Sequence, residues 1–295
     1  MSPQLSPFEV FFQGLRIITK NRSALIGLIF ISLMVLISIF APLIAIHSPI
    51  ETFEGALRLG PWSYFQDKGL FILGTDDLGR DLFSRIIYGG RVSLWVGFWI
   101  SAITSFFGSS IGLIGGYFGG WTDRILMRLM DLILAMPSIL LAIVVVAVLG
   151  PGITNSIIAL SVVSLPVFAR LVRSQVLIEK NKAYVEASRL FGSSHLRTMF
   201  VEILPNCTSL IVVQASFCFG EAILVCAALG FLGLGAQAPI PEWGAMLSDS
   251  KVFLLSNPLL MVIPGLAIMA SVLSFNWLGD GIRDALDPKH NRGRS

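Results

Sequence analysis

Long apolar segments recur along the chain and set the first expectation about its fold. The segments that reach spanning length are residues 24–46, 92–117, 129–149, 153–172, 208–235 and 258–278. A helix of about 20 apolar residues crosses a hydrocarbon core of about 30 Å. Spanning strands would alternate apolar and polar positions over about 9–11 residues, whereas these segments are longer and apolar on all sides. The pattern predicts an all-α integral membrane protein with six transmembrane helices.

Composition supports the same class. Hydrophobic residues make up 55% of the chain and charged residues 13%, and the mean hydropathy is +0.80. A soluble domain carries about 25% charged residues, so this chain lacks the polar surface that a globule in water needs. The first apolar segment follows several basic residues, as a signal peptide does, but it exceeds the signal-peptide core of about 7–15 residues. We therefore expect it to stay in place as the first span.

The placement of Lys and Arg predicts the orientation. With the N-terminus in the cytoplasm, the cytoplasmic loops and tails carry 15 of the 21 basic residues. Since basic residues accumulate on the cytoplasmic side, both termini are expected there. The expected divisions are a cytoplasmic segment 1–23, the first span 24–46, a periplasmic segment 47–90, a membrane core 91–280 with a cytoplasmic loop at about 177–207, and a cytoplasmic tail 281–295.

Glycines recur at every fourth position in the second span. These residues are Gly108, Gly112, Gly116 and Gly120. A spacing of four places them in one column on a helix face, where a neighbouring backbone can approach closely, and such contacts drive helix association in lipid. The column predicts tight helix packing, within the chain or with a partner.

The loop at 177–207 reads as two short helices. Its apolar residues recur at roughly helical spacing among polar ones; they are Val185, Leu190, Leu196, Met199, Phe200 and Ile203. Gly192 permits a sharp turn, Ser193 or Ser194 can cap the second helix, and Pro205 is expected to end it. The prediction is a helical hairpin on the cytoplasmic surface with an apolar ridge.

Several positions in this loop resemble the EAA loop of ABC importer permeases. The matching residues are Glu186, Ala187, Ser188, Gly192, Leu204 and Pro205. The family prefers an isoleucine two residues before the leucine, where this chain has Glu202; the departure affects one packing position and leaves the turn glycine and the proline intact. The resemblance implies that the loop docks as a coupling helix into a groove on a cytoplasmic ATPase subunit.

Further stretches resemble the dipeptide, oligopeptide and nickel permeases of that family. They lie at 73–94, 229–244 and 279–288, and the likeness covers about residues 10–290. The first contains a motif expected at the periplasmic face, made of Gly74, Thr75, Asp76, Asp77, Gly79, Arg80 and Asp81. Its carboxylates could suggest a metal site, but the adjacent glycines and arginines favour a salt-bridged turn, with contact to a binding protein as the alternative.

The resemblance implies a type I ABC importer permease fold and a function. The chain would be the transmembrane permease of an ATP-driven, binding-protein-dependent importer of dipeptides or oligopeptides in the bacterial inner membrane. It would work with a second homologous permease, two cytoplasmic ATPase subunits and a periplasmic substrate-binding protein. Nickel, glutathione and antimicrobial peptides remain open as substrates. The chain itself would carry no catalytic residue, metal or cofactor, since ATP and Mg²⁺ would lie on the partner subunits, and we expect no nucleic acid partner.

One acidic residue stands inside an apolar span. Relatives in the family often carry an acid near positions 225–226, where this chain has Val225 and Cys226, and the nearest acid is Glu221. A carboxylate in lipid is costly unless it is paired or lines a wet cavity. Glu221 could line the pore and meet a peptide's amino terminus or a partner's cation, or it could be a protonated or hydrogen-bonded packing residue.

Other classes of protein fit the sequence less well. A secondary transporter or channel needs a coupling-ion site, usually several intramembrane ionisable groups and often inverted repeats; the chain offers one mid-span acid and no visible repeat. No G-x-x-x-x-G-K-[ST] phosphate loop occurs. The G-x-S-x-G match at 108–112 lies within a predicted membrane helix, and the histidines lie in loops or tails, so a serine hydrolase is excluded. Cys207, Cys218 and Cys226 have neither disulfide nor metal-site spacing.

Overall fold

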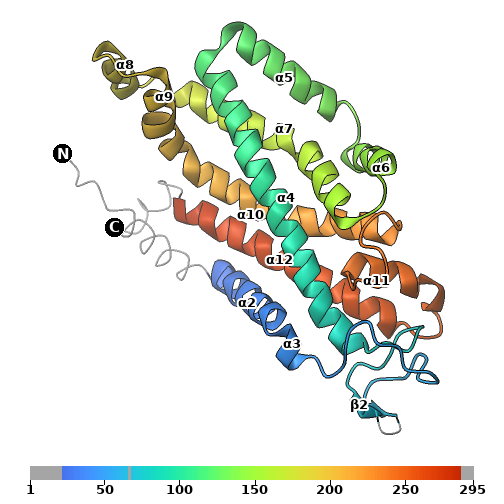
Figure 1. Cartoon of the computed structure of the whole chain (residues 1–295). Coiled ribbons are helices and arrows are strands. Elements are labelled where there is room, and N and C mark those ends of the chain that lie inside the picture. The colour runs from blue at the N-terminus through green and yellow to red at the C-terminus, as the bar shows by residue number, and fades with distance from the viewer. Residues whose placement is uncertain (1–21, 66–67, 287–295) are drawn as a thin grey trace.

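The computed structural model describes residues 22–65 and 68–286, and these residues form a helical bundle (Figure 1). The long helices are α2 (Arg22–Ile39), α4 (Leu82–Phe118), α7 (Ile153–Glu179), α10 (Leu204–Phe231) and α12 (Leu259–Leu286). Shorter elements are α3 (Ala41–Ile44), β1 (Ser63–Tyr64), β2 (Leu70–Phe71), α5 (Gly120–Leu134), α6 (Ser138–Leu149), α8 (Ala183–Leu190), α9 (His195–Arg197), η2 (Thr198–Ile203), α11 (Trp243–Ser250) and η3 (Lys251–Phe253). Most of the expected segments 1–23 and 281–295 lies outside the described residues or at their edge.

The predicted number of spans is confirmed once the third is counted as a bent pair. Five helices are long and apolar enough to cross a membrane, and α5 with α6 makes a sixth span that is bent by 90°. We predicted one continuous helix over 129–149, which is wrong. Pro137 lacks the backbone N–H that a helix needs and disfavours helical geometry at Met136, so the helix stops at Leu134 and restarts at Ser138.

The second span begins ten residues earlier than the apolar pattern predicted. Asp81 caps α4, because its carboxylate accepts hydrogen bonds from the backbone N–H groups of Phe83 and Ser84. The first turns of α4 therefore take up residues that we expected in the periplasmic segment. The cap satisfies free N–H groups at the start of the helix and so fixes where α4 begins.

The glycine column packs α4 against α7. A Cβ atom on Gly108 would lie 2.6 Å from Cβ of Phe168, and one on Gly116 would lie 2.9 Å from Cβ of Val176. Both distances are too short for real side chains, so the glycines permit this close approach. Gly120 does not belong to the column: α4 ends at Phe118 and Gly120 has a φ of +55° with open space around it. Its role is to help reverse the chain into α5.

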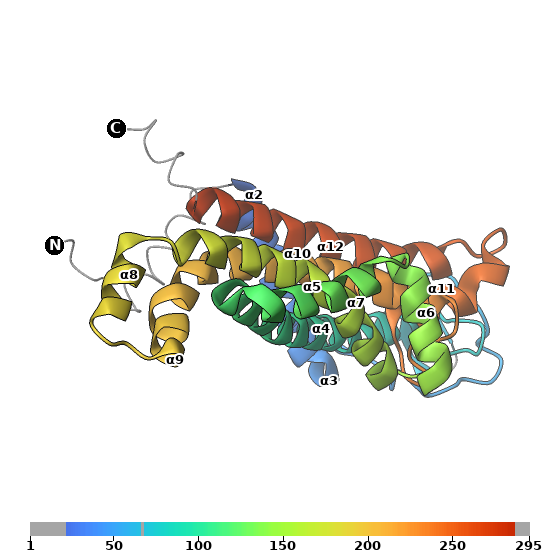
Figure 2. The ribbon, with the colours of Figure 1, turned by 90° about the horizontal axis from the view of Figure 1, so that it is seen from above.

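The helices define two ends of the bundle. We call the end that carries α8, α9 and η2 the loop end, and the opposite end, which carries residues 47–65, 68–81 and α11, the far end (Figures 1 and 2). The start of α2 and the end of α12 lie together, because Gly281 contacts Ala24. The end of α12 also lies beside the middle of α10, since Gly279 contacts Phe217. The described ends of the chain therefore share the loop end.

Candidate functional site

The loop that resembles a coupling helix forms the predicted hairpin. Gly192 makes the turn with a φ of +83°, and its N–H donates to the carbonyl of Arg189 at 3.0 Å. Ser194, one of the two predicted caps, accepts a hydrogen bond from the N–H of Arg197 at 3.3 Å. The short helices α8 and α9 thus stand side by side at the loop end (Figure 2).

The prediction that Pro205 ends the second helix is wrong. Residues His195–Phe231 form one continuous helical stretch, in which Pro205 occupies the first turn of α10. The preceding segment η2 is a π-helix, where the N–H of Leu204 reaches back to the carbonyl of Met199. A π-turn is wider than an α-turn, and it carries the chain past a residue that has no N–H to donate.

The apolar ridge of the loop divides into a buried and an exposed side. Val185, Met199 and Ile203 are buried in a cluster with residues of α4, α7 and α10. The opposite side consists of Leu190 (87% exposed), Phe191 (91%), Leu196 (68%) and Phe200 (53%). We call these four residues the apolar tip. Phe191 was missing from the predicted ridge because it lies in the turn, outside helical spacing.

A buried carboxylate on α7, that of Glu179, joins the base of the hairpin to α7. The Glu179 side chain, 3% exposed, accepts hydrogen bonds from Lys182 Nζ at 2.7 Å, from the Tyr184 hydroxyl at 2.7 Å and from Gln175 Nε2 at 3.1 Å. Burial and the neighbouring Glu179 carboxylate raise the pKa of Tyr184. The Tyr184 hydroxyl therefore keeps its proton and holds α8 against the end of α7.

Glu202, the departure from the family pattern, ties α8 to η2. Its carboxylate accepts a hydrogen bond from the Ser188 hydroxyl, which also lies 2.7 Å from the Ser193 hydroxyl. The Glu202 carbonyl accepts from Asn206 Nδ2 at 2.7 Å, and the same amide donates to the Tyr184 hydroxyl at 3.1 Å. We treated this position as packing only, which missed its role; a glutamate opposite two serines was the available signal.

The remaining residues of the predicted coupling loop occupy different surroundings. Glu186 is exposed in the first turn of α8, and Ala187 is half-buried beside it. Leu204 is half-buried against the cluster beneath the hairpin, whereas Pro205 is exposed. The structure thus brings Ser188 and Leu204 into the body of the hairpin, places Gly192 at its exposed turn and leaves Glu186 on its surface.

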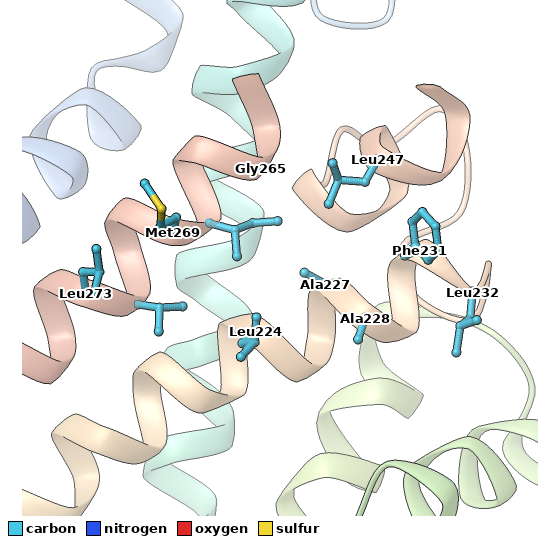
Figure 3. A pocket seen from close by; sticks show the side chains of 11 residues that line it. Leu224, Ala227, Ala228, Phe231, Leu232, Leu247, Gly265, Met269 and Leu273 are labelled. Atoms are coloured by element: carbon cyan, nitrogen blue, oxygen red, sulfur yellow. The ribbon is translucent and has the colours of Figure 1, made fainter. Parts of the chain in front are cut away.

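Glu221 lies on a face of α10 that the rest of the described chain leaves uncovered. Its side chain is exposed, and within the described residues no hydrogen bond or ion pair holds it. One turn further toward the far end, Leu224 begins an apolar groove of about 660 Å³ between α10 and α12. Figure 3 shows Leu224, Ala228 and Phe231 of α10 along one wall and Met269 of α12 along the other. Glu221 therefore marks the polar end of an otherwise apolar face.

The acidic motif at the far end forms a cap and ion pairs. Asp76 accepts from Arg80 Nε at 2.6 Å and lies 3.3 Å from Arg85 Nε, and Arg80 lies 3.6 Å from Asp249. Burial raises the pKa of Asp77, assisted by the Asp76 carboxylate. Gly74 and Gly79 shape the backbone with positive φ, and the Thr75 side-chain hydroxyl donates to the carbonyl of Ala56. This geometry agrees with the salt-bridged turn.

Two family models match the chain. Residues 108–292 match the binding-protein-dependent transport system inner membrane component. Residues 11–61 match the N-terminal TM domain of oligopeptide transport permease C.

Curated proteins and a solved structure are similar over most of the chain. The dipeptide transport system permease protein DppC of Alkalihalophilus pseudofirmus is 49% identical, over 97% of this chain and 91% of its own. DppC of Haemophilus influenzae is 50% identical over 92% of each chain. The glutathione transport system permease protein GsiD of Pectobacterium atrosepticum is 42% identical over 96% of this chain and 92% of its own. The inward-facing MetNI methionine ABC transporter shares the fold, with a TM-score of 0.51 and 20% identity over 66% of this chain and 94% of its own.

Proposed function

Because the chain belongs to the family of binding-protein-dependent transport system inner membrane components, we propose that it is the permease of an ATP-driven importer of dipeptides and oligopeptides. Its membership implies a second permease, ATPases and a substrate-binding protein as partners. The dipeptide assignment rests on relatives named dipeptide permeases at 49% and 50% identity over more than nine-tenths of this chain.

The apolar tip is the observation that supports ATPase docking. Leu190, Phe191 and Leu196 project from the loop end with most of their surface uncovered. They belong to a polar hairpin outside the long apolar helices, so water surrounds them unless a protein covers them. An exposed apolar patch rimmed by polar groups marks an interaction site, and a short helix that presents such residues suits a groove on a partner.

The hairpin is built to pass force into the membrane. Glu179 and Tyr184 fasten α8 to α7, and Glu202 fastens α8 to η2. Since η2 continues without a break into α10, a push on the tip moves the helix that carries Glu221. We assign the coupling role to Glu186, Ala187, Ser188, Gly192, Leu204 and Pro205 as one unit, which does no chemistry itself.

The same assignment fixes the orientation and the substrate path. With ATPases bound at the loop end, that end faces the cytoplasm, and both termini lie there. The far end then faces outward and receives peptide from the binding protein. We place the path along the uncovered face of α10, between this chain and the second permease, where the Glu221 carboxylate can meet a peptide's ammonium group. ATP and Mg²⁺ belong to the partner subunits, and this chain requires no cofactor.

Co-purification with transport partners tests the proposal. The chain is expressed with its genomic neighbours and isolated in mild detergent, and ATPase activity is measured with binding protein and with dipeptide, tripeptide, glutathione or nickel. We expect a second permease and ATPases to co-purify, and dipeptides to stimulate hydrolysis most. If only glutathione or only nickel stimulates hydrolysis, the assignment of the substrate changes, but the assignment of the chain as an importer permease stands. If the chain is isolated without any ATPase and shows ion-dependent transport in liposomes, the importer proposal is wrong and the chain is a secondary transporter.

A further inference from the structure

Arg91 is a cation on a membrane-spanning helix with no acidic partner in the described residues. It lies in α4, and its side chain is exposed. No ion pair joins it to a described carboxylate, whereas Arg80 and Arg85, one to three turns earlier in the chain, lie within 4.0 Å of Asp76. An arginine left on a lipid-facing helix costs several kcal/mol unless its head reaches a polar group. Its surroundings should therefore supply an anion.

The depth of Arg91 matches the headgroup region on the far side. Leu82 begins α4 at the far end, and nine residues of helix rise about 14 Å. Ser38 of α2 lies beside Gly90, the residue before Arg91, and α2 itself ends at Ile39. Arg91 is thus level with the last turn of the first span, where a long basic side chain can reach the membrane surface.

An apolar groove leads from Arg91 toward the middle of the bundle. It has a volume of about 510 Å³ and runs between α2 and α4 over a floor formed by α10 and α12. Val35, Phe98 and Phe275 line it, and its exposed lining is almost entirely carbon. The stacked rings of Phe219 and Phe275, whose centroids lie 3.9 Å apart, form the floor. A groove with one cation at its mouth and hydrocarbon walls complements an amphiphile with an anionic head.

Aromatic residues mark the same level of the helix. Trp95 follows Arg91 by one turn and is 58% exposed. Its ring centroid lies 5.5 Å from that of Trp99 and 6.4 Å from that of Phe98. Exposed tryptophans gather at the membrane–water interface, because their rings suit the headgroup region. Trp95 and Trp99 follow Arg91 along α4, so they lie between the level of its guanidinium group and the apolar level of the groove.

We propose that Arg91 and the groove between α2 and α4 bind a phospholipid of the outward-facing leaflet. Its phosphate pairs with the Arg91 guanidinium, and one acyl chain lies along Val35 and Phe98. The bound lipid would fill the space between the first helix and the core. The site depends on this chain's membrane location and on none of the assignments of substrate, whereas the choice of leaflet rests on the orientation proposed above.

Photo-crosslinking in the co-purified complex tests the proposal. A photoreactive phenylalanine analogue at Phe98 is activated in membranes that contain phosphatidylglycerol, and the adducts are identified by mass spectrometry. We expect an adduct with the mass of a phospholipid. Arg91→Gln should lower its yield about tenfold, because a charge-assisted hydrogen bond is lost, and Arg91→Lys should retain most of it. Val35→Phe, which narrows the groove without altering charge, should lower the yield as well.

Matched conditions separate a lipid from other occupants. Arg128→Gln makes the same charge change on α5, away from the groove, and should leave the adduct unchanged. Excess inorganic phosphate should not compete; if it abolishes the adduct, the site is an anion site and the lipid proposal is wrong. An adduct to a polypeptide would assign the groove to a partner helix, and equal yields from wild type, Arg91→Gln and Val35→Phe would overturn the site altogether.

Discussion

Single residues decide whether the hairpin at the loop end keeps its shape. Glu202 is the clearest example, because its carboxylate joins η2 to Ser188 while its backbone carbonyl joins Asn206. A hydrophobic residue at this position could pack against α8 but could not accept a hydrogen bond from the Ser188 hydroxyl. A polar contact therefore holds the hairpin of this chain together at this position.

Removal of this contact should loosen the hairpin. Glu202→Ala removes the carboxylate that accepts a hydrogen bond from the Ser188 hydroxyl, and a lost hydrogen bond of a charged group costs about 1–3 kcal/mol. Arg189 and Arg197 flank the turn, so trypsin reports its opening. We expect cleavage there to rise about tenfold and peptide uptake to fall, with Glu202→Gln intermediate. Equal cleavage rates for wild type and Glu202→Ala would show that the contact contributes nothing.

Gly192 tests the turn itself. Glycine can adopt the φ of +83° found here, whereas proline cannot, because its ring fixes φ near −65°. Gly192→Pro should distort the turn and uncouple transport while the chain still inserts into the membrane. Gly192→Asn, which tolerates the left-handed region, serves as the control and should retain most uptake. Normal uptake by Gly192→Pro would contradict the coupling role of the loop.

Glu221 offers a test of the substrate path. If its carboxylate meets a peptide's ammonium group, Glu221→Gln should reduce uptake of free peptides about tenfold, as expected for one lost charge-assisted contact. The same substitution should not alter uptake of N-acetylated peptides. Competition assays with both peptide types provide the measurement. A uniform loss for both types would instead assign Glu221 to packing or to a contact with the second permease.

At the level of elements, periodicity predicted which segments are helices but not where they break. The apolar pattern identified all six spans, because a run of about 20 apolar residues has few alternatives in lipid. It missed the bend at Pro137 and the continuity through Pro205. A proline can end, bend or begin a helix, and the outcome depends on packing with distant segments. The capping role of Asp81 could have been read locally, since an aspartate preceding a helix is a common cap.

The contact between α4 and α7 is the element-level feature that the sequence described best. A Cβ on Gly112 would collide with the carbonyl oxygen of Ala169, so a larger residue must push the helices apart. Gly112→Leu should destabilise the bundle by about 1–3 kcal/mol or more, as overpacking does. Gly265→Ala in α12 is the control, because the nearest atom to its added Cβ lies 4.0 Å away. Melting temperatures in detergent compare the two; similar values would refute the packing role.

Over the whole molecule, the two ends are built differently and are joined by α4 and α10. The far end is stabilised by ion pairs and a helix cap, and the loop end by a polar network with an apolar tip above it. The family resemblance predicted this division, but the network of Glu179, Tyr184 and Glu202 could not be predicted, because it joins residues of three segments whose proximity depends on the fold. The exposure of Phe191 was likewise a property of the turn and not of a periodic pattern.

If the apolar tip serves only to bind the ATPases, a substitution there should weaken ATPase binding without lowering the stability of the chain itself. Phe191 is 91% exposed, so Phe191→Asp removes little packing within the chain and should leave its melting temperature nearly unchanged. It should nevertheless abolish retention of the ATPases, because a buried aspartate in an apolar groove is unpaired. Leu255→Asp makes the same type of change at a residue that is fully exposed between η3 and α12, and it should retain the ATPases. Pull-down from mild detergent measures both variants. If Phe191→Asp keeps its ATPases while Leu255→Asp loses them, the docking surface lies at the far end, and the proposed orientation of the chain must be reversed.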